Sequence, residues 1–136
     1  ANDCLWGTLS CTVLIDSQTQ SQYRSALDSA IANLRYGAIG INLWSAMLFY
    51  LGSTTWGAYP GNPLTDIGSG IGFVHNSYLF DRPQKSVVYA PFRILPTPVW
   101  FATHKHLLGI AKHLLKFEAY PTWQNLPAVI MAALRG

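Results

Sequence analysis

Apolar and polar positions near the start of the chain predict a strand followed by a helix. Residues 9–15 are nearly all apolar and end in β-branched side chains, which is typical of a strand with both faces buried. Asp16 and Ser17 can each cap a helix that follows, and Gln20 stands at capping-box spacing from Ser17. Apolar side chains then recur at helical spacing on one face of this predicted helix: Tyr23, Leu27, Ile31 and Leu34.

A second strand follows the predicted helix after a short connection. Gly37 stands where a left-handed residue often ends a helix, and residues 38–42 form a short apolar run. A strand, a helix and a second strand joined by short connections make a βαβ unit, in which the two strands run parallel. The first part of the chain is therefore predicted to have an α/β fold with parallel strands.

The rest of the chain contains fewer regular segments. Residues 43–72 are rich in glycine and predict loops. Residues 85–89 predict a short strand between two prolines, which suits an edge strand or an arm. Thr103 can cap a helix that runs to about Glu118, and residues 121–134 predict a final short helix with a proline in its first turn or at a break.

Charge is sparse in this chain, and that restricts how its surface can be covered. Only 11% of the residues are charged and 50% are hydrophobic, whereas about 25% of a typical soluble domain is charged. We therefore expect apolar surface to be buried against the rest of a longer chain, a second subunit or a membrane. The membrane is the least favoured of these partners, because the longest apolar run, residues 38–51, is shorter than the ~20 residues of a spanning helix. The first residues also lack the pattern of a signal peptide.

The distribution of basic residues and cysteines argues against two further classes of protein. The nine Lys and Arg residues are dispersed and form no stripe, so a nucleic acid is not expected as a partner. Cys4 and Cys11 fit the free thiols of a cytoplasmic protein better than a disulfide framework.

Three groups of residues invite a functional interpretation, and for each the residues themselves favour a structural one. The Gly68–Gly72 segment lacks the spacing of a dinucleotide-binding loop and predicts a tight turn. His106 and His113 share a helix face but stand about two turns apart, too far for the adjacent-turn pairing of a helical zinc site. Three carboxylates are isolated, so nothing pairs them for acid–base catalysis: Asp66, Asp81 and Glu118.

Several short motifs, taken in order, resemble the late part of the aldehyde dehydrogenase superfamily. The central one runs from Leu34 through Gly37 to Asn42, and Trp56-Gly-Ala58 follows where that family usually has an aromatic residue and two glycines. Asn2 with the Trp-Gly turn before Leu9, and the Lys85–Val88 strand, resemble two further family segments. The resemblance spans roughly residues 2–91. Thr55 replaces a usual proline, the stretch before it is longer than in the family, and residues 92–136 extend beyond the point where most members end.

This resemblance implies a division of the chain and a place for its substrate. Residues 1–91 would be the C-terminal portion of a catalytic domain with an oligomerisation strand at 85–89, and residues 92–136 a helical extension. The loop after Asn42 and the later aromatic residue would line the aldehyde tunnel, where apolar walls exclude water. The implied substrate-binding residues are Leu43, Trp44, Ser45, Ala46, Met47 and Trp56. Taken without the resemblance, Trp44, Met47 and Trp56 are explained equally well as core residues.

The chemistry of that family depends on parts that precede the matched region. A cysteine nucleophile, a glutamate base and a Rossmann domain that holds NAD or NADP are all absent from this segment, and neither Cys4 nor Cys11 stands in the nucleophile's context. We therefore assign no catalytic, cofactor-binding or metal-binding residue to the chain. The strand at 85–89 implies contact with an identical subunit, and the rest of the enzyme is the other implied partner.

Three hypotheses follow for the function. The leading one is a cytoplasmic, C-terminal segment of an NAD(P)-dependent aldehyde dehydrogenase, which oxidises an aldehyde to a carboxylic acid and is inactive as this segment alone. The second is a stand-alone, non-catalytic interaction module derived from that family. The third is a membrane-surface protein that uses its last two helices.

Overall fold

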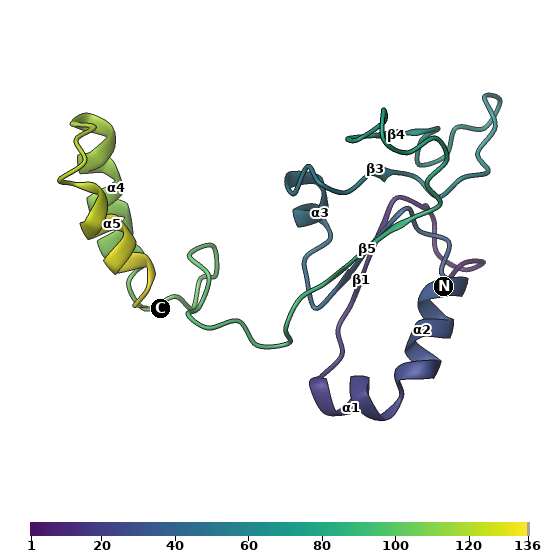
Figure 1. Cartoon of the computed structure of the whole chain (residues 1–136), viewed down its shortest axis with the longest axis horizontal. Coiled ribbons are helices and arrows are strands. Elements are labelled where there is room, and N and C mark those ends of the chain that lie inside the picture. The colour runs from purple at the N-terminus through teal and green to yellow at the C-terminus, as the bar shows by residue number, and fades with distance from the viewer. Residues whose placement is uncertain (136) are drawn as a thin grey trace. The chain divides into compact units, whose positions relative to one another are not determined.

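The computed structural model describes residues 1–135, and these residues divide into two compact units. The first unit is Ala1–Phe92 and the second begins at Arg93. The first is a mixed α/β unit and the second is helical (Figure 1). The first unit contains β1 (Ser10–Val13), α1 (Ser17–Gln22), α2 (Arg24–Asn33), β2 (Ala38–Ile41), α3 (Ala46–Tyr50), β3 (Trp56–Gly57), β4 (Phe73–Val74) and β5 (Ser86–Tyr89).

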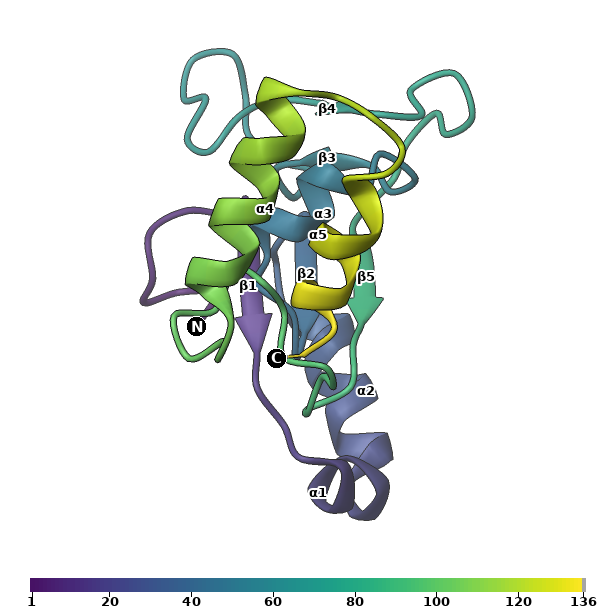
Figure 2. The ribbon, with the colours of Figure 1, turned by 90° about the vertical axis from the view of Figure 1, so that its left-hand side faces the viewer.

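A three-stranded sheet organises the first unit. Its strand order is β1-β2-β5, and both pairs of neighbours are parallel. Figure 2 shows the three strands side by side in this order. This confirms the strands predicted within residues 9–15 and 38–42, and their parallel pairing. The strands β1 and β2 and the helices between them thus form the expected βαβ unit.

One face of this sheet carries the apolar core. Ile39 and Ile41 of β2 are fully buried and pack with Leu27 and Ile31 of α2. Side chains from the flanking strands complete the cluster: Cys11, Val13 and Val87. Each of these lies at the same register as an isoleucine of β2, as expected because side chains on one face recur at every second residue. Leu27 and Ile31 thus confirm the apolar stripe predicted for this helix.

The other face of the sheet carries mostly small and hydroxyl-bearing residues, together with Val88 of β5. Ala38 and Gly40 alternate with the two isoleucines of β2 and so point to the opposite side. The chain turns back over this side directly after β2, and a Cβ on Gly40 would lie 2.5 Å from the carbonyl oxygen of Leu43. Glycine is therefore needed at position 40, because the backbone passes too close for any side chain. Figure 1 shows α2 and α3 on opposite sides of the sheet.

The predicted helix after Asp16 is present but is divided in two. The Asp16 carboxylate accepts hydrogen bonds from the backbone N–H groups of Gln18 and Thr19, at 3.0 and 3.1 Å, which confirms it as the N-cap. The helix is interrupted at Tyr23, whose backbone angles are not helical, and α2 begins at Arg24. Tyr23 is exposed at this break, so the prediction that it belongs to the buried stripe is wrong.

The C-terminus of α2 is capped by side chains that are distant in sequence, and not by Gly37. The helix ends at Leu34, whose backbone is extended, and Gly37 does not have a left-handed backbone. The prediction of a left-handed cap at Gly37 is therefore wrong. The Lys85 ammonium donates to the carbonyl oxygens of Ile31, Ala32 and Leu34, at 3.0, 2.7 and 2.7 Å. A cation here also suits the negative end of the helix dipole.

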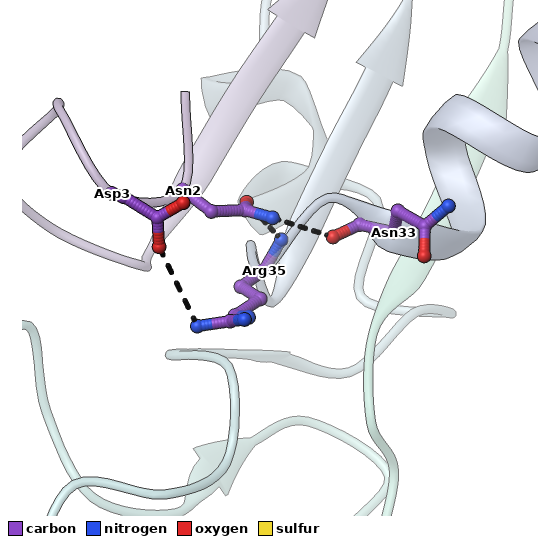
Figure 3. Close-up of polar contacts among 4 residues, drawn as sticks. All are labelled: Asn2, Asp3, Asn33 and Arg35. Atoms are coloured by element: carbon purple, nitrogen blue, oxygen red, sulfur yellow. Dashed lines mark hydrogen bonds and ion pairs between the residues drawn. The ribbon is translucent and has the colours of Figure 1, made fainter.

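Asn2 provides a second bridge at the same helix end (Figure 3). Its amide nitrogen donates to the carbonyl oxygen of Asn33 at 2.7 Å, and its amide oxygen accepts from the backbone N–H of Arg35 at 2.8 Å. The Arg35 guanidinium lies 3.9 Å from the Asp3 carboxylate, and both of these side chains are mostly exposed. The two hydrogen bonds of Asn2 therefore fix the N-terminal segment to the α2–β2 connection, whereas the exposed ion pair contributes little.

The glycine-rich middle of the chain is more ordered than predicted. It contains the short helix α3 and a two-stranded antiparallel ribbon of β3 and β4. The backbones of Gly37 and Gly57 lie close together where this ribbon approaches the sheet. A Cβ on Gly37 would collide with the Gly57 carbonyl oxygen. Gly37 thus serves a close approach of two backbones instead of a helix cap. The expected turn at Gly68–Gly72 is present, with left-handed backbone angles at its three glycines.

The predicted strand at 85–89 is confirmed as β5, at an edge of the sheet. It pairs with β2 of its own chain and does not project as a separate arm. The outer edge of β5 and that of β1 have no neighbouring strand in the part of the chain that the structure describes. Pairing of β5 with another subunit stays a prediction.

The second unit contains two packed helices, α4 (Leu107–Ala119) and α5 (Leu126–Ala133). The predicted C-terminal helices are thus confirmed, with Pro127 in the first turn of α5. Thr103 is not the cap of α4, because the helix begins four residues later. The buried His104 ring explains the late start, since its Nδ1 accepts the backbone N–H of His106 at 3.1 Å while its Nε2 lies 3.1 Å from the Ala133 carbonyl oxygen.

Candidate functional site

The candidate site begins at the carboxyl end of β2, the central strand of the parallel sheet. Asn42, the next residue, has a left-handed backbone with φ 57°. Its side chain accepts from the backbone N–H of Ile15 and donates to the Ile15 carbonyl oxygen, both at 2.8 Å. Asn42 therefore joins the ends of β1 and β2 and sets the direction of the loop that follows. Ligands of open parallel sheets bind at this end of the strands.

The loop after Asn42 is held against β1 by two hydroxyl side chains. Thr12 donates to the Leu43 carbonyl oxygen and accepts from the backbone N–H of Ser45, both at 3.2 Å. The Ser45 hydroxyl donates to the Ser10 hydroxyl, also at 3.2 Å. Ser10 and Thr12 lie on the sheet face opposite the apolar core, because their register partners are Ala38 and Gly40. The polar residues of β1 thus position the loop.

The structure places the six predicted substrate-binding residues in three different settings. Leu43, Ser45, Ala46 and Met47 are half-buried in the loop and the first turn of α3. Trp44 is 66% exposed, so its side chain is not part of the core. Trp56 is half-buried in β3. Residues 43–47 thus lie together in the loop and the first turn of α3, with Trp44 as the exposed one, and Trp56 lies on a separate element.

An aromatic cluster that the sequence analysis did not identify joins α3 to the β3–β4 ribbon. The ring of Phe49 lies 5.8 Å from Trp56 and 5.8 Å from Tyr50, in edge-to-face orientations, and 5.1 Å from His75. Edge-to-face aromatic pairs at this separation are attractive. Phe49 therefore links Trp56 to the helix that begins with Ala46 and Met47. The aromatic pair Phe49-Tyr50 in an apolar run was the sequence signal for this cluster.

His75 is held in the cluster by a strained turn. His75 and Asn76 both have left-handed backbones, with φ 65° and 50°, and such angles are uncommon outside glycine. The Asn76 side chain donates to the Gly52 carbonyl oxygen at 2.9 Å and thereby ties the turn to the segment after α3. The Nδ1 atom of His75 is buried without a hydrogen-bond partner. The ring contact with Phe49 and the Asn76 bond are the interactions that hold this turn in place.

The loop and its surroundings are uncharged. No Asp, Glu, Lys or Arg stands between Arg35 and Asp66. Burial raises the pKa of the Cys11 thiol, which packs against the apolar core on the face opposite the loop, and a raised pKa disfavours the reactive thiolate. This arrangement can contact an apolar molecule, but it supplies neither a charged acid–base group nor an activated nucleophile.

Two open cavities lie elsewhere in the first unit. One of about 460 Å³ is lined by α1, α2 and Tyr89, and another of about 330 Å³ is lined by residues that include Thr54, Phe80 and Lys85. None of the six predicted tunnel residues lines either cavity. Neither of these cavities therefore corresponds to the predicted aldehyde tunnel.

The remaining candidate groups do not form a further site among residues 1–135. Gly68–Gly72 follows no strand and opens no helix, and its Ser69 hydroxyl accepts the backbone N–H of Thr8 at 2.8 Å, so the segment does not fit a dinucleotide. Among residues 1–135, no group of His, Cys, Asp and Glu could hold a metal ion. Within the same range, no helix is both long enough and apolar enough to cross a membrane.

Comparisons with protein-family models, curated proteins and solved structures found no match to this chain.

Proposed function

We propose that this chain is the C-terminal segment of an NAD(P)-dependent aldehyde dehydrogenase and contributes one wall of its aldehyde tunnel. In this proposal the loop from Leu43 to Met47 contacts the apolar part of the aldehyde, and Trp56 contacts it further along the tunnel. The chain also provides contacts to another subunit. The proposal rests on the resemblance in residues 2–91 together with the position and chemistry of this loop.

The observation that carries the proposal is the exposed Trp44 at the carboxyl end of β2. A tryptophan with 66% of its surface exposed is not needed for the core, yet the backbone on both sides of it is fixed by Thr12. A rigid backbone that presents a large apolar side chain at the ligand-binding edge of a parallel sheet is suited to contact a substrate. The uncharged stretch around it suits the apolar part of an aldehyde.

The chain's own residues would bind and orient the substrate and exclude water, without performing the oxidation. Cys11 faces the apolar core and Cys4 is exposed far from the loop in sequence, so neither is proposed as the nucleophile. The Gly68–Gly72 turn does not fit the dinucleotide, so the cofactor would be held by another part of the enzyme. We accordingly propose that this segment is inactive by itself.

The direct test is to isolate the native polypeptide that contains this sequence and to measure its intact mass and its aldehyde-dependent reduction of NAD and NADP. We expect a polypeptide several times larger than the 15.0 kDa of this chain, with dehydrogenase activity that the 136-residue segment lacks. Reduction of either nucleotide by the segment alone would contradict the proposal. A larger polypeptide without any dehydrogenase activity would also contradict it.

A second candidate function is a stand-alone interaction module. The outer edges of β1 and β5 have no neighbouring strand among the described residues, and unpaired strand edges can bind an added strand. A native polypeptide with the mass of this chain alone would favour this candidate. In that case chemical cross-linking at β1 or β5 to another protein strand would be the expected result.

A further inference from the structure

The helical hairpin of α4 and α5 has apolar surface that its own packing leaves uncovered. Neither helix contains a buried residue, although the two helices pack against each other. Within α4, Leu108, Ala111 and Leu115 recur at i, i+3 and i+7, a spacing that places them on one face. Leu108 is 70% exposed and Leu115 is 65% exposed. We call these three residues the leucine stripe.

Two lysines lie on one side of the leucine stripe, and Glu118, at i+3 from Leu115, continues its row toward the end of α4. Lys112 and Lys116 follow Ala111 and Leu115 directly, so each lies about 100° around the helix from a member of the stripe. The unit from Arg93 onward holds five of the nine Lys and Arg residues but only one of the six acidic residues, Glu118. Two of these five, Lys112 and Lys116, belong to the hairpin itself, and the others lie before α4 or after α5.

Aromatic and aliphatic side chains extend the exposed surface beyond α4. Trp123, in the turn between the helices, is 86% exposed, and Tyr120 beside it is also exposed. Along α5, Ile130, Met131 and Leu134 are exposed at i, i+1 and i+4. Tryptophan and tyrosine favour the boundary between lipid headgroups and acyl chains, because their rings are apolar with one polar group.

We propose that the α4–α5 hairpin binds the surface of an anionic lipid membrane, with the leucine stripe inserted at the interface and Lys112 and Lys116 near the lipid phosphates. A helix with an apolar face and a lysine-bearing flank lies in the plane of such a surface. At 13 residues, α4 is about 20 Å long and is too short to span a bilayer.

Charge complementarity is the reason for choosing an anionic lipid over a second copy of the chain. A second copy would carry the same excess of basic over acidic residues in this unit, five to one, and like charges in juxtaposition oppose association. An anionic surface attracts Lys112 and Lys116 and accommodates Leu108 and Leu115 beside them. The inference is independent of the proposed dehydrogenase function, and it revises the low weight given to a membrane on sequence grounds.

The test uses the full chain and vesicles of defined composition. One set is made of phosphatidylcholine, and a second of phosphatidylcholine mixed with phosphatidylglycerol. We expect the protein to sediment with the mixed vesicles and not with phosphatidylcholine alone, and to be released by high salt. Tryptophan emission is expected to shift to shorter wavelength on binding, and Trp123→Phe is expected to remove most of that shift.

Three variants separate the contribution of the lysines to vesicle binding from that of the leucines. The pair Lys112→Gln and Lys116→Gln should weaken vesicle binding by about five-fold for each lysine. The pair Leu108→Glu and Leu115→Glu should abolish it, with an unchanged helical circular-dichroism spectrum because both side chains are already exposed. Leu64→Glu is the matched control, because Leu64 is an 84% exposed leucine of the other unit. This variant should bind the mixed vesicles as well as the unaltered chain does.

Several results would overturn the inference. The first is absence of binding to the mixed vesicles, and the second is equal binding to both kinds of vesicle. The third is retention of binding by the Leu108→Glu and Leu115→Glu variant. A stable dimer that this variant converts to a monomer, without vesicle binding by the unaltered chain, would show that the hairpin is a protein interface instead.

Discussion

The two faces of the parallel sheet differ in what they are made of and in what they hold. One face carries Ile39 and Ile41, which are completely buried against α2. The other carries Ala38 and Gly40, over which the chain from Leu43 turns back. The same four-residue strand, β2, supplies both faces by alternation. Large side chains thus stabilise the fold on one side, and small ones leave room for a loop on the other.

The flanking strands repeat this division. Cys11, Val13 and Val87 extend the apolar face, whereas Ser10, Thr12 and Ser86 place hydroxyl groups on the loop face. Ser86 donates to the Thr55 carbonyl oxygen at 2.9 Å, in the same way as Thr12 donates to Leu43. Stability therefore depends mainly on burial at one face, and loop position depends on hydrogen bonds at the other. Substitutions on the two faces should have different consequences.

The largest expected difference is between two truncations of aliphatic side chains. Ile39→Ala removes a fully buried side chain and should lower the free energy of unfolding by about 2–5 kcal/mol. Val88→Ala, at the register of Gly40 on the loop face, should lower it by about 1 kcal/mol because Val88 is only half-buried. Urea denaturation of both variants measures the difference. Equal losses would show that the two faces are packed alike.

A smaller effect is expected from the hydroxyl group that positions the loop. Thr12→Val keeps the shape of the side chain but removes the donor to Leu43 and the acceptor for Ser45, so it should cost about 0.5–1.5 kcal/mol. Thr12→Ser is the matched control and should retain both bonds. Amide hydrogen exchange at Ser45 should become faster in the valine variant only. Unchanged exchange at Ser45 in Thr12→Val would mean that the hydroxyl does not hold the loop.

The smallest effect concerns the cap of α1, the short helix that precedes α2. Hydrogen bonds from the Thr19 side chain and from the backbone N–H groups of Thr19 and Gln18 lower the pKa of Asp16. Because the folded-state pKa is lowered, this stabilisation is present above the unfolded pKa of about 4 and is lost as the pH falls through the folded value. Asp16→Ala should therefore be less stable than the unaltered chain at neutral pH, and the two should converge in acid. A difference in stability that does not change with pH would contradict this account.

The βαβ unit could be predicted from the sequence because its signals are local. The apolar period of the first helix, the cap at Asp16 and the two short apolar runs each involve neighbouring residues. The wrong predictions arose where distant residues decide the outcome. Lys85 and Asn2 cap α2 from positions far along the chain, and Gly57 determines why Gly37 must be a glycine. Periodicity along the chain contains no information about such contacts.

The candidate site was only partly predictable, for a related reason. The residues from Leu43 to Met47 were predicted because the family resemblance places its tunnel loop after the strand-ending Asn42, and their contact with a substrate stays a prediction. The short helix α3 was missed, since its five residues are too few for a periodic pattern. Phe49, Trp56 and His75 belong to separate parts of the chain, and only the folded structure brings their rings together.

The central claim is the proposal that the loop face presents a substrate-binding wall, and the substitution Trp44→Ala in the native polypeptide that contains this sequence tests it most directly. We expect the free energy of unfolding to change by less than about 0.5 kcal/mol, because Trp44 is exposed. The value of kcat/KM should fall by about ten-fold for a long apolar aldehyde and change little for a short one. Trp6→Ala, which also removes an exposed tryptophan, is the control and should leave kcat/KM unchanged for both aldehydes. Unchanged kinetics for the long aldehyde in Trp44→Ala, or an equal loss for both aldehydes, would contradict the account.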